Sequence, residues 1–282
     1  MKKAFVFALT LLFVSAGFGQ KLEKIKGNRK VLTRVYTVPS FKRLSFGGDL
    51  RVKIKETPDT VKIQLRADEN LQDVLGYSVH EGVLHLGVNK QIIRKKAFEI
   101  TVFVNKSFEG LMLKDYARAE MDDKLNADAF YLQLADRARA DLSLKVQDTM
   151  SVNLMNDSQL RGDLEAKKMY VHSTDNAKVN ATFFVKKLKL QADRRAKFDL
   201  KGDIKNADLD LNGKANFYAY KTDFSHRVTI YGKKKSTAYL HAKNLEKLEI
   251  NLTDSAALHV SGKVKKYDLK TFEDSAELYH EK

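Results

Sequence analysis

A spacing of 19 to 21 residues, repeated along most of the chain, constrains the fold more than any other feature of the sequence. It separates nine small residues that each follow a polar corner, and we call these the marker residues: Ala117, Ala138, Ser158, Ala177, Ala196, Ala215, Ser236, Ala256 and Ala276. Nine near-equal intervals indicate a repeat architecture, in which each unit buries its apolar face against its neighbours.

Apolar residues alternate with polar residues inside each repeat. The residue two positions after every marker is apolar, from Ala119 in the first repeat to Leu278 in the last. Pairs of apolar residues also lie four and six positions before several markers, as Leu134 and Leu132 do. A period of two is the spacing of a β-strand, in which alternate side chains share one face.

Together these two periods predict an all-β fold, a parallel β-helix (solenoid) of about nine coils of about 20 residues each. At about 3.3 Å per residue, one repeat spans a circuit of roughly 65 Å, which fits a coil of two or three strands. Coils stacked about 4.8 Å apart would pair every strand with its counterparts above and below. The leucine-rich-repeat pattern is absent, and a propeller blade would need a repeat of about 40 residues.

Three places depart from the pattern. Ser173 and Gly232 take positions that point inward, where other repeats have larger apolar side chains. The last repeat, residues 267–278, is out of phase by about one residue. This shift predicts a bulge or fraying in the last coil.

The sequence divides into four predicted parts. Residues 1–19 have the layout of a secretory signal peptide, with Lys2 and Lys3 ahead of an apolar run and a cleavage position near Gly19. A membrane anchor is the alternative, but the apolar run, from residue 4 to about residue 16, is too short to span a bilayer. Residues 20–39 form a leader, residues 40–107 a β-rich N-terminal part that caps or begins the stack, and residues 108–282 the β-helix repeats.

The expected location and the charge of the chain limit the kinds of partner that it can bind. We expect an exported protein of the periplasm, the cell surface or the extracellular space, with no transmembrane segment and, because cysteine is absent, no disulfide or lipid-bearing cysteine. The 51 Lys and Arg residues outnumber the 36 Asp and Glu residues. This excess favours anionic partners such as acidic polysaccharide, lipopolysaccharide or a cell surface, or it serves only to keep a repetitive β-surface soluble. No nucleic-acid-binding module is recognisable, so we expect no nucleic acid partner.

Two N-terminal segments carry a resemblance to a known family. These are FKRLSFGGDLRVKIKE, residues 41–56, and IQLRADENLQDVLGYSVHEGVLHLGV, residues 63–88. With the DxA and DxS corners of the coils that follow, they resemble the putative auto-transporter adhesin family with a head GIN domain (DUF2807), common among exported proteins of the Bacteroidetes. The resemblance covers nearly the whole chain after the signal peptide and implies a β-helix-like stack. It also implies a role in adhesion, although the family name rests on structural similarity to surface proteins.

Aspartates recur at the corners beside the markers, with Gly213 and Lys234 as exceptions. Stacking would align these carboxylates, and each neighbouring pair would repel by roughly 1 kcal/mol in water. Either each aspartate accepts a hydrogen bond from its own turn while basic residues screen the charge, or the column holds divalent cations. The Gly-rich Ca²⁺-binding nonapeptide is absent, so we expect no metal and no other cofactor. The seven aspartates are Asp115, Asp136, Asp157, Asp175, Asp193, Asp254 and Asp274, and the screening residues are Arg118, Arg137, Arg139, Lys178, Arg194 and Lys197.

An enzyme is the alternative function. Parallel β-helices host polysaccharide lyases and hydrolases, whose sites need carboxylates clustered on one face. Here an aspartate occurs in nearly every repeat, which is typical of a structural position. The seven histidines have no metal-binding or catalytic spacing, and no G-x-S-x-G elbow is present. We therefore predict no catalytic residue and keep a carbohydrate-active lyase or hydrolase as the second hypothesis.

The most divergent corner, in YGKKKSTAYL at residues 231–240, replaces the aspartate with lysines. Tyrosine rings on a β-face can stack on sugars while lysines attract anionic groups. A solvated corner with packing tyrosines is the alternative. The predicted function is a non-enzymatic exported protein of the cell envelope, an adhesin or binding module for anionic glycans or surfaces. Its candidate binding residues are Lys233, Lys234, Lys235, Tyr218, Tyr220, Tyr231 and Tyr239.

Overall fold

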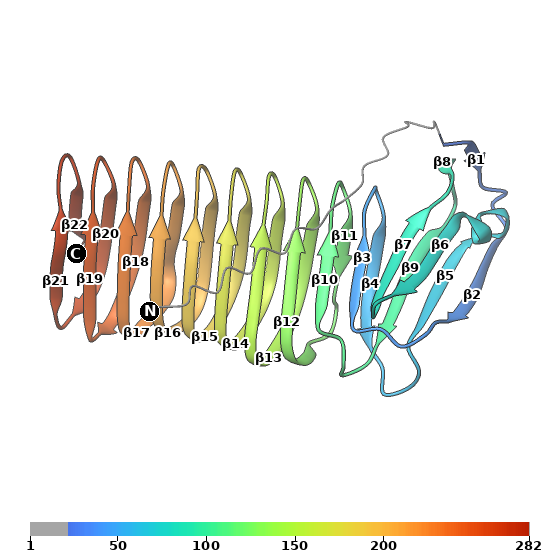
Figure 1. The fold of residues 1–282 in the computed structure, drawn as a ribbon, viewed down its shortest axis with the longest axis horizontal. Helices are drawn as coiled ribbons and strands as arrows, with labels where there is room; N and C mark the ends of the chain where they lie inside the picture. The colour runs from blue at the N-terminus through green and yellow to red at the C-terminus, as the bar shows by residue number, and fades with distance from the viewer. Residues whose placement is uncertain (1–21, 282) are drawn as a thin grey trace, which may run out of the picture.

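The described part of the chain, residues 22–281, forms a β-solenoid with a cap of antiparallel strands at its N-terminal end. In this computed structural model the coils stand in one row, from the cap to the red C-terminal coil (Figure 1). The solenoid has about nine turns, which confirms the predicted all-β parallel β-helix. The predicted signal peptide lies outside the described residues. Within them, no helix is long and apolar enough to cross a membrane.

Each coil has two layers of strand joined at two corners. The first layer runs toward the corner that holds the marker residue, and the second layer runs away from it to a far corner. In the middle of the solenoid, one long strand covers the second layer of one coil and the first layer of the next. The solenoid strands are β10 (Gly110–Leu113), β11 (Arg118–Glu120), β12 (Leu125–Leu134), β13 (Arg139–Leu154), β14 (Gln159–Ser173), β15 (Lys178–Ala192), β16 (Lys197–Leu211), β17 (Asn216–Gly232), β18 (Thr237–Leu245), β19 (Lys247–Leu252), β20 (Ala257–Val264), β21 (Tyr267–Phe272) and β22 (Glu277–Glu281).

The marker residues lie in one file along the solenoid, as the repeat predicts. The carbonyl oxygen of Ala138 accepts a hydrogen bond from the N–H of Gln159, and that of Ser158 accepts one from the N–H of Lys178. The markers from Ala117 to Ala256 are at most 2% exposed. Small side chains fit this corner because the two layers converge toward it.

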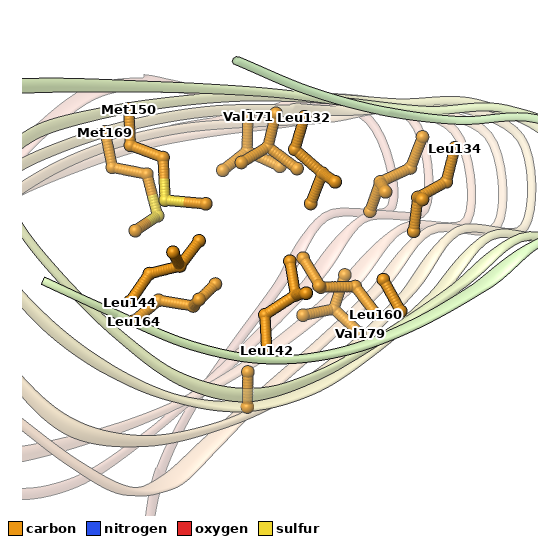
Figure 2. Close-up of a cluster of buried hydrophobic side chains, with 14 of the residues drawn as sticks. Leu132, Leu134, Leu142, Leu144, Met150, Leu160, Leu164, Met169, Val171 and Val179 are labelled. Atoms are coloured by element: carbon orange, nitrogen blue, oxygen red, sulfur yellow. The ribbon is translucent and has the colours of Figure 1, made fainter. Parts of the chain in front are cut away.

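The interior is a continuous column of apolar side chains supplied by both layers. In the view along the axis, Leu132, Met150 and Val171 of the first layer face side chains of the second layer, with Leu134 and Leu160 toward the narrow side (Figure 2). All of these residues are at most 4% exposed. Burying each such side chain stabilises the fold by roughly 1.5–3 kcal/mol.

The predicted irregularities are present. Ser173 points inward and is fully buried. Gly232 faces the interior at a place where an added Cβ would lie 2.7 Å from Cδ2 of Leu252. In the last coil Ile250 pairs with Leu269 but Asn251 pairs with Thr271, so β21 carries one extra residue and the predicted bulge is confirmed.

The N-terminal part begins the stack and caps it. Its strands β3 and β4 form a coil of their own, because Leu44 pairs with Leu111 and Val52 pairs with Ala119 in parallel register. Beyond this coil, β7 and β9 add one parallel strand to each layer, and the antiparallel strands β6, β5 and β2 close the end (Figure 1). The elements of this part are β1 (Lys24–Lys26), β2 (Val31–Thr37), β3 (Arg43–Phe46), β4 (Arg51–Glu56), β5 (Lys62–Asp68), the 3₁₀ helix η1 (Glu69–Val74), β6 (Leu75–His80), β7 (Val83–Val88), β8 (Gln91–Arg94) and β9 (Phe98–Val104).

A buried carboxylate holds the cap together. Asp68 is fully buried and accepts hydrogen bonds from the backbone N–H groups of Arg29, Lys96 and Ala97 at 3.0 to 3.2 Å. Burial opposes ionisation of this carboxyl, but the hydrogen bonds outweigh burial and hold the pKa of Asp68 below its ordinary value. Asp68 therefore ties the leader to the turn before β9 in its charged form.

The opposite end of the solenoid is uncovered. Leu269 and Phe272 of the last coil are 57% and 45% exposed, whereas Ile250 and Leu252, their pairing neighbours in the preceding coil, are at most 1% exposed. The difference arises because the described chain places no further coil over β21 and β22.

Candidate binding surface

The marker corner is a four-residue turn whose first central residue has a positive φ. In the coil of β10 and β11, the N–H of Ala117 donates to the carbonyl of Lys114, and Asp115 has a φ of 60°. Glycine, asparagine and aspartate tolerate this conformation better than other residues, which explains why aspartate recurs at the corner. The residues at this position are Gly48, Asp115, Asp136, Asn156, Asp175, Arg194, Gly213, Lys234, Asp254 and Asp274.

Two of the seven predicted aspartates, Asp157 and Asp193, do not lie in the column of the other five. Asn156 and Arg194 hold the positive-φ position in two of the coils, and Asp157 and Asp193 lie one residue to either side of it. The aligned carboxylates are therefore interrupted by an amide, a cation and, further on, Gly213. Counting two residues back from Ser158 and Ala196 gives Asn156 and Arg194, so placing Asp157 and Asp193 in this column was wrong.

The corner carboxylates join one coil to the next. Asp115 accepts a hydrogen bond from the N–H of Gly48 at 2.9 Å, and Asp254 accepts one from the N–H of Lys234 at 2.9 Å. Both bonds run to the preceding coil, so the predicted bond to the aspartate's own turn is wrong at these corners. The carboxylates act as structural links between corners.

The basic residues expected to screen the aspartates fall into two groups. Arg194 forms an ion pair with Asp175, and Arg137 donates a hydrogen bond of 2.6 Å to the hydroxyl of Tyr116. The outer face of the second layer carries the other four: Arg118, Arg139, Lys178 and Lys197. Across residues 22–281, no three His, Asp or Glu side chains come together in a way that could hold a metal ion.

The three candidate lysines form an exposed corner between β17 and β18. Lys234 holds the positive-φ position, at 61°. Equivalent hydrogen bonds, from Lys235 N–H to the carbonyl of Gly213 and from Lys214 N–H to that of Arg194, place basic residues at the same position in successive corners. We call this exposed group the basic corner: Arg194, Arg195, Lys214, Lys233, Lys234 and Lys235.

Beside the basic corner, an aromatic ladder runs along the outer face of the second layer. Its members are paired in register and stacked: Tyr218, Tyr239, His259 and Tyr279. Their successive ring centroids are 5.3, 4.3 and 4.5 Å apart. Only Tyr218 and Tyr239 were predicted from the sequence; His259 and Tyr279 were not. Each member is the third residue after a marker, so the repeat could have revealed the whole ladder.

Stacking decides which parts of the ladder face the solvent. The faces of Tyr239 and His259 are covered by neighbouring rings, so these residues present ring edges and polar atoms. Tyr220 lies with its ring centroid 5.0 Å from that of Tyr239 and is 48% exposed. Burial of the hydroxyl, together with the neighbouring Tyr239, raises the pKa of Tyr220. At the inner end of the ladder, the ammonium of Lys197 lies 5.1 Å from the ring centroid of Tyr218.

The structure separates Tyr231 from the other candidate tyrosines. Tyr231 pairs with Asp210 in the first layer, whereas Tyr218 pairs with Asp199 in the second. The apolar interior lies between the two layers, so Tyr231 faces the opposite side of the solenoid. The structure thus brings Tyr218, Tyr220 and Tyr239 together with the ladder and leaves Tyr231 apart.

The sequence matches the family model described as putative auto-transporter adhesin, head GIN domain (DUF2807), over residues 40–162 and again over residues 148–263. The chain belongs to this family. The two matches follow one another along the solenoid and together cover most of its coils. Membership indicates a non-enzymatic, adhesin-like role and an exported or surface-exposed protein. No curated protein matches the sequence.

Three solved structures with TM-scores above 0.5 share the fold of this chain. A putative adhesin from Parabacteroides merdae ATCC 43184 is 14% identical, with a TM-score of 0.65 over 92% of this chain and 100% of that chain. A putative adhesin from Parabacteroides distasonis ATCC 8503 is 15% identical, with a TM-score of 0.60 over 91% and 100%. A putative lipid binding protein from the same strain is 14% identical, with a TM-score of 0.56 over 92% and 97%. At these identities the likeness concerns the fold.

Proposed function

We propose that this protein is an exported, non-enzymatic adhesin of the cell envelope that binds anionic glycans or anionic surfaces through the basic corner and the adjoining aromatic ladder. Membership in an adhesin family supports the general role. The observation that supports the choice of surface is the position of Lys233, Lys234 and Lys235. They lie at the corner directly before β18, the strand that carries Tyr239 and its stacked contacts.

The chemistry of this surface suits a carbohydrate that carries negative charge. The exposed ammonium and guanidinium groups of the basic corner attract carboxylate, sulfate or phosphate groups. Tyr220 and the edges of the ladder offer apolar ring surface and hydroxyl groups within the same area. The surface is extended and open, so it can contact a polymer or a cell surface without enclosing it.

The direct test is retention of the mature protein on immobilised acidic polysaccharide and on whole cells. We expect binding that weakens as salt rises and that falls when Lys233, Lys234 and Lys235 are changed together to Gln. The matched control is the far-corner variant, in which Lys167, Lys186 and Lys205 are changed to Gln. These three lysines are exposed, lie in three successive coils and carry the same total charge.

Equal loss of binding in both variants would show that net charge alone is responsible and would refute the assigned surface. Salt-independent absence of retention across a broad panel of acidic and neutral glycans, and on cells, would refute the adhesive function itself.

A further inference from the structure

A straight row of cations runs along the outer face of the second layer, next to the coils that carry the aromatic ladder. Pairing in parallel register places Arg51, Arg118 and Arg139 one above another, followed after Gln159 by Lys178 and Lys197. Arg161 lies two residues along the strand from Gln159 and so points to the same side. We call these six residues the cationic track.

The track cations form no ion pairs in the part of the chain that the structure describes. Among the ion pairs that residues 22–281 form, none involves a member of the track. Five of the six are exposed, and Arg118 is half-buried. Like charges held about one strand spacing apart repel one another, so the fold maintains an arrangement that a polyanion would relieve.

A second row, of hydrogen-bonding groups, runs parallel to the track. Its carboxylate and amide members are exposed and paired in register two residues further along each strand: Glu120, Asp141, Asn180 and Asp199. Two cations share this row: Lys53 precedes Glu120, and Arg161 of the track lies between Asp141 and Asn180. Two shallow depressions, of about 250 and 110 Å³, lie between the two rows. The first is lined by Lys178, Lys197, Asn180 and Asp199, and the second by Arg118, Arg139, Glu120 and Asp141.

We propose that the cationic track binds a linear acidic polysaccharide that lies along the solenoid axis. Carboxylate or sulfate groups of the polymer contact the Arg and Lys row, and its hydroxyl groups donate to the carboxylate and amide oxygens of the parallel row. The coils repeat about every 4.8 Å, which is close to the length of one sugar in an extended chain. This inference rests on the proposed function and names the polymer class and its direction.

The same surface fits nucleic acid poorly. Glu120, Asp141 and Asp199 place three carboxylates among the six cations of the track. A duplex carries one negative charge for about every 1.7 Å of axis, so these carboxylates would repel its closely spaced phosphates. A polymer with one charge and several hydroxyls per sugar can use both rows.

The track also connects with the aromatic ladder. Lys197, its last member, lies over the ring of Tyr218, the first member of the ladder. A polymer aligned with the axis can therefore continue from the track past Tyr218 toward Tyr239. A polymer running parallel to the strands would reach only the cations of one or two coils.

The experiment measures the affinity of the mature protein for polygalacturonate, a linear polymer with one carboxylate per sugar, at low and moderate salt. Fully methyl-esterified polygalacturonate is the uncharged control polymer, and oligo-dT and duplex DNA are the nucleic acid controls. The track variant changes Arg139, Lys178 and Lys197 to Gln, and the far-corner variant described above removes the same number of charges. All of these residues are exposed, and cooperative unfolding of each variant verifies that it is folded.

We expect the track variant to bind polygalacturonate about tenfold or more weakly than the wild type, and the far-corner variant to bind within about twofold. The salt dependence should become shallower only in the track variant. For oligogalacturonates of increasing length, affinity should rise until the chain spans the roughly 24 Å from Arg51 to Lys197, and then level off.

Equal weakening in both variants, or an affinity that stops rising at two sugars, would overturn the track while leaving the adhesive function in place. Tighter binding of oligo-dT or duplex DNA than of polygalacturonate, lost in the track variant, would overturn the polysaccharide assignment. If the wild type binds no acidic polymer but still adheres to cells or neutral glycans, the track is refuted and the adhesive function stands.

Discussion

Replacing Lys234 with glycine is expected to stabilise the protein. Lys234 has a φ of 61° at the marker corner, a position that Gly213 holds in the preceding coil and Asp254 in the next. A left-handed conformation costs a non-glycine residue about 1–2 kcal/mol. The backbone N–H of Lys234, which donates to Asp254, is retained in the variant.

The size of the effect follows from two opposing terms. Glycine removes the conformational strain but adds about 0.5–1 kcal/mol of unfolded-state entropy. The expected net gain in the free energy of unfolding is therefore about 0.5–1 kcal/mol for Lys234→Gly. Lys235 is the matched control, because it is the next residue, equally exposed, and not among the residues with positive φ. Lys235→Gly should lose about 0.5–1 kcal/mol for the entropy term alone.

Urea unfolding of the wild type and the two variants, followed by far-UV circular dichroism, measures both changes in the free energy of unfolding. Each variant loses one positive charge, so the loss of charge is the same in both. We expect the free energy of unfolding to rise in Lys234→Gly and to fall in Lys235→Gly. If both substitutions destabilise the protein to the same extent, strain at the corner does not explain why aspartate, asparagine and glycine recur there.

Three further substitutions test other parts of the structure. Ser158→Ala should raise the free energy of unfolding by about 1 kcal/mol, because the buried hydroxyl of Ser158 has no hydrogen-bond partner; a loss in urea unfolding would contradict this. Gly162→Ala should lower it by at least about 2 kcal/mol, since φ is 121° there and a Cβ would lie 1.8 Å from the carbonyl oxygen of Leu142; unchanged stability would show that the strand does not pass so close. Because the folded pKa of Asp68 is lowered, its contribution to stability is complete above the unfolded pKa of about 3.9 and is lost as pH falls through the folded value. Asp68→Asn should therefore flatten the acid limb of a stability-against-pH curve, and an unaltered limb would argue against the cap carboxylate.

The repeat was predictable from the sequence because every coil has the same pattern of buried and exposed positions. Alternating side chains identify the strands, and the small residues at the narrow corner mark the period, as Ala138, Ser158 and Ala177 do. The coil of β3 and β4 was harder to recognise, because β5 to β9 are inserted before the next coil and break the spacing. Its marker position is Leu50, whose carbonyl accepts a hydrogen bond from Arg118 N–H.

The surface was predictable only in part, because function there depends on which columns the register brings together. The lysines at 233–235 and the tyrosines at 218 and 239 stand out in two successive repeats. The absence of ion pairs at Arg139 and Lys178 could not be predicted, because aspartates lie close to both residues in the sequence and suggest ion pairs. Only the register of the stacked coils shows that the corner aspartates and these basic residues lie in different columns, the latter on the outer face of the second layer.

The most direct test of the account is a set of distances between spin labels along one column. The chain has no cysteine, so pairs of introduced cysteines can be labelled cleanly. Labels at Arg139 and Asn216 are four coils apart and should be separated by roughly 19 Å, and labels at Arg139 and Ala257, six coils apart, by roughly 29 Å. Distances that rise by about 4.8 Å with each coil are the predicted result. Distances that do not increase in step with the number of coils would contradict the stacked solenoid and every surface assigned on it.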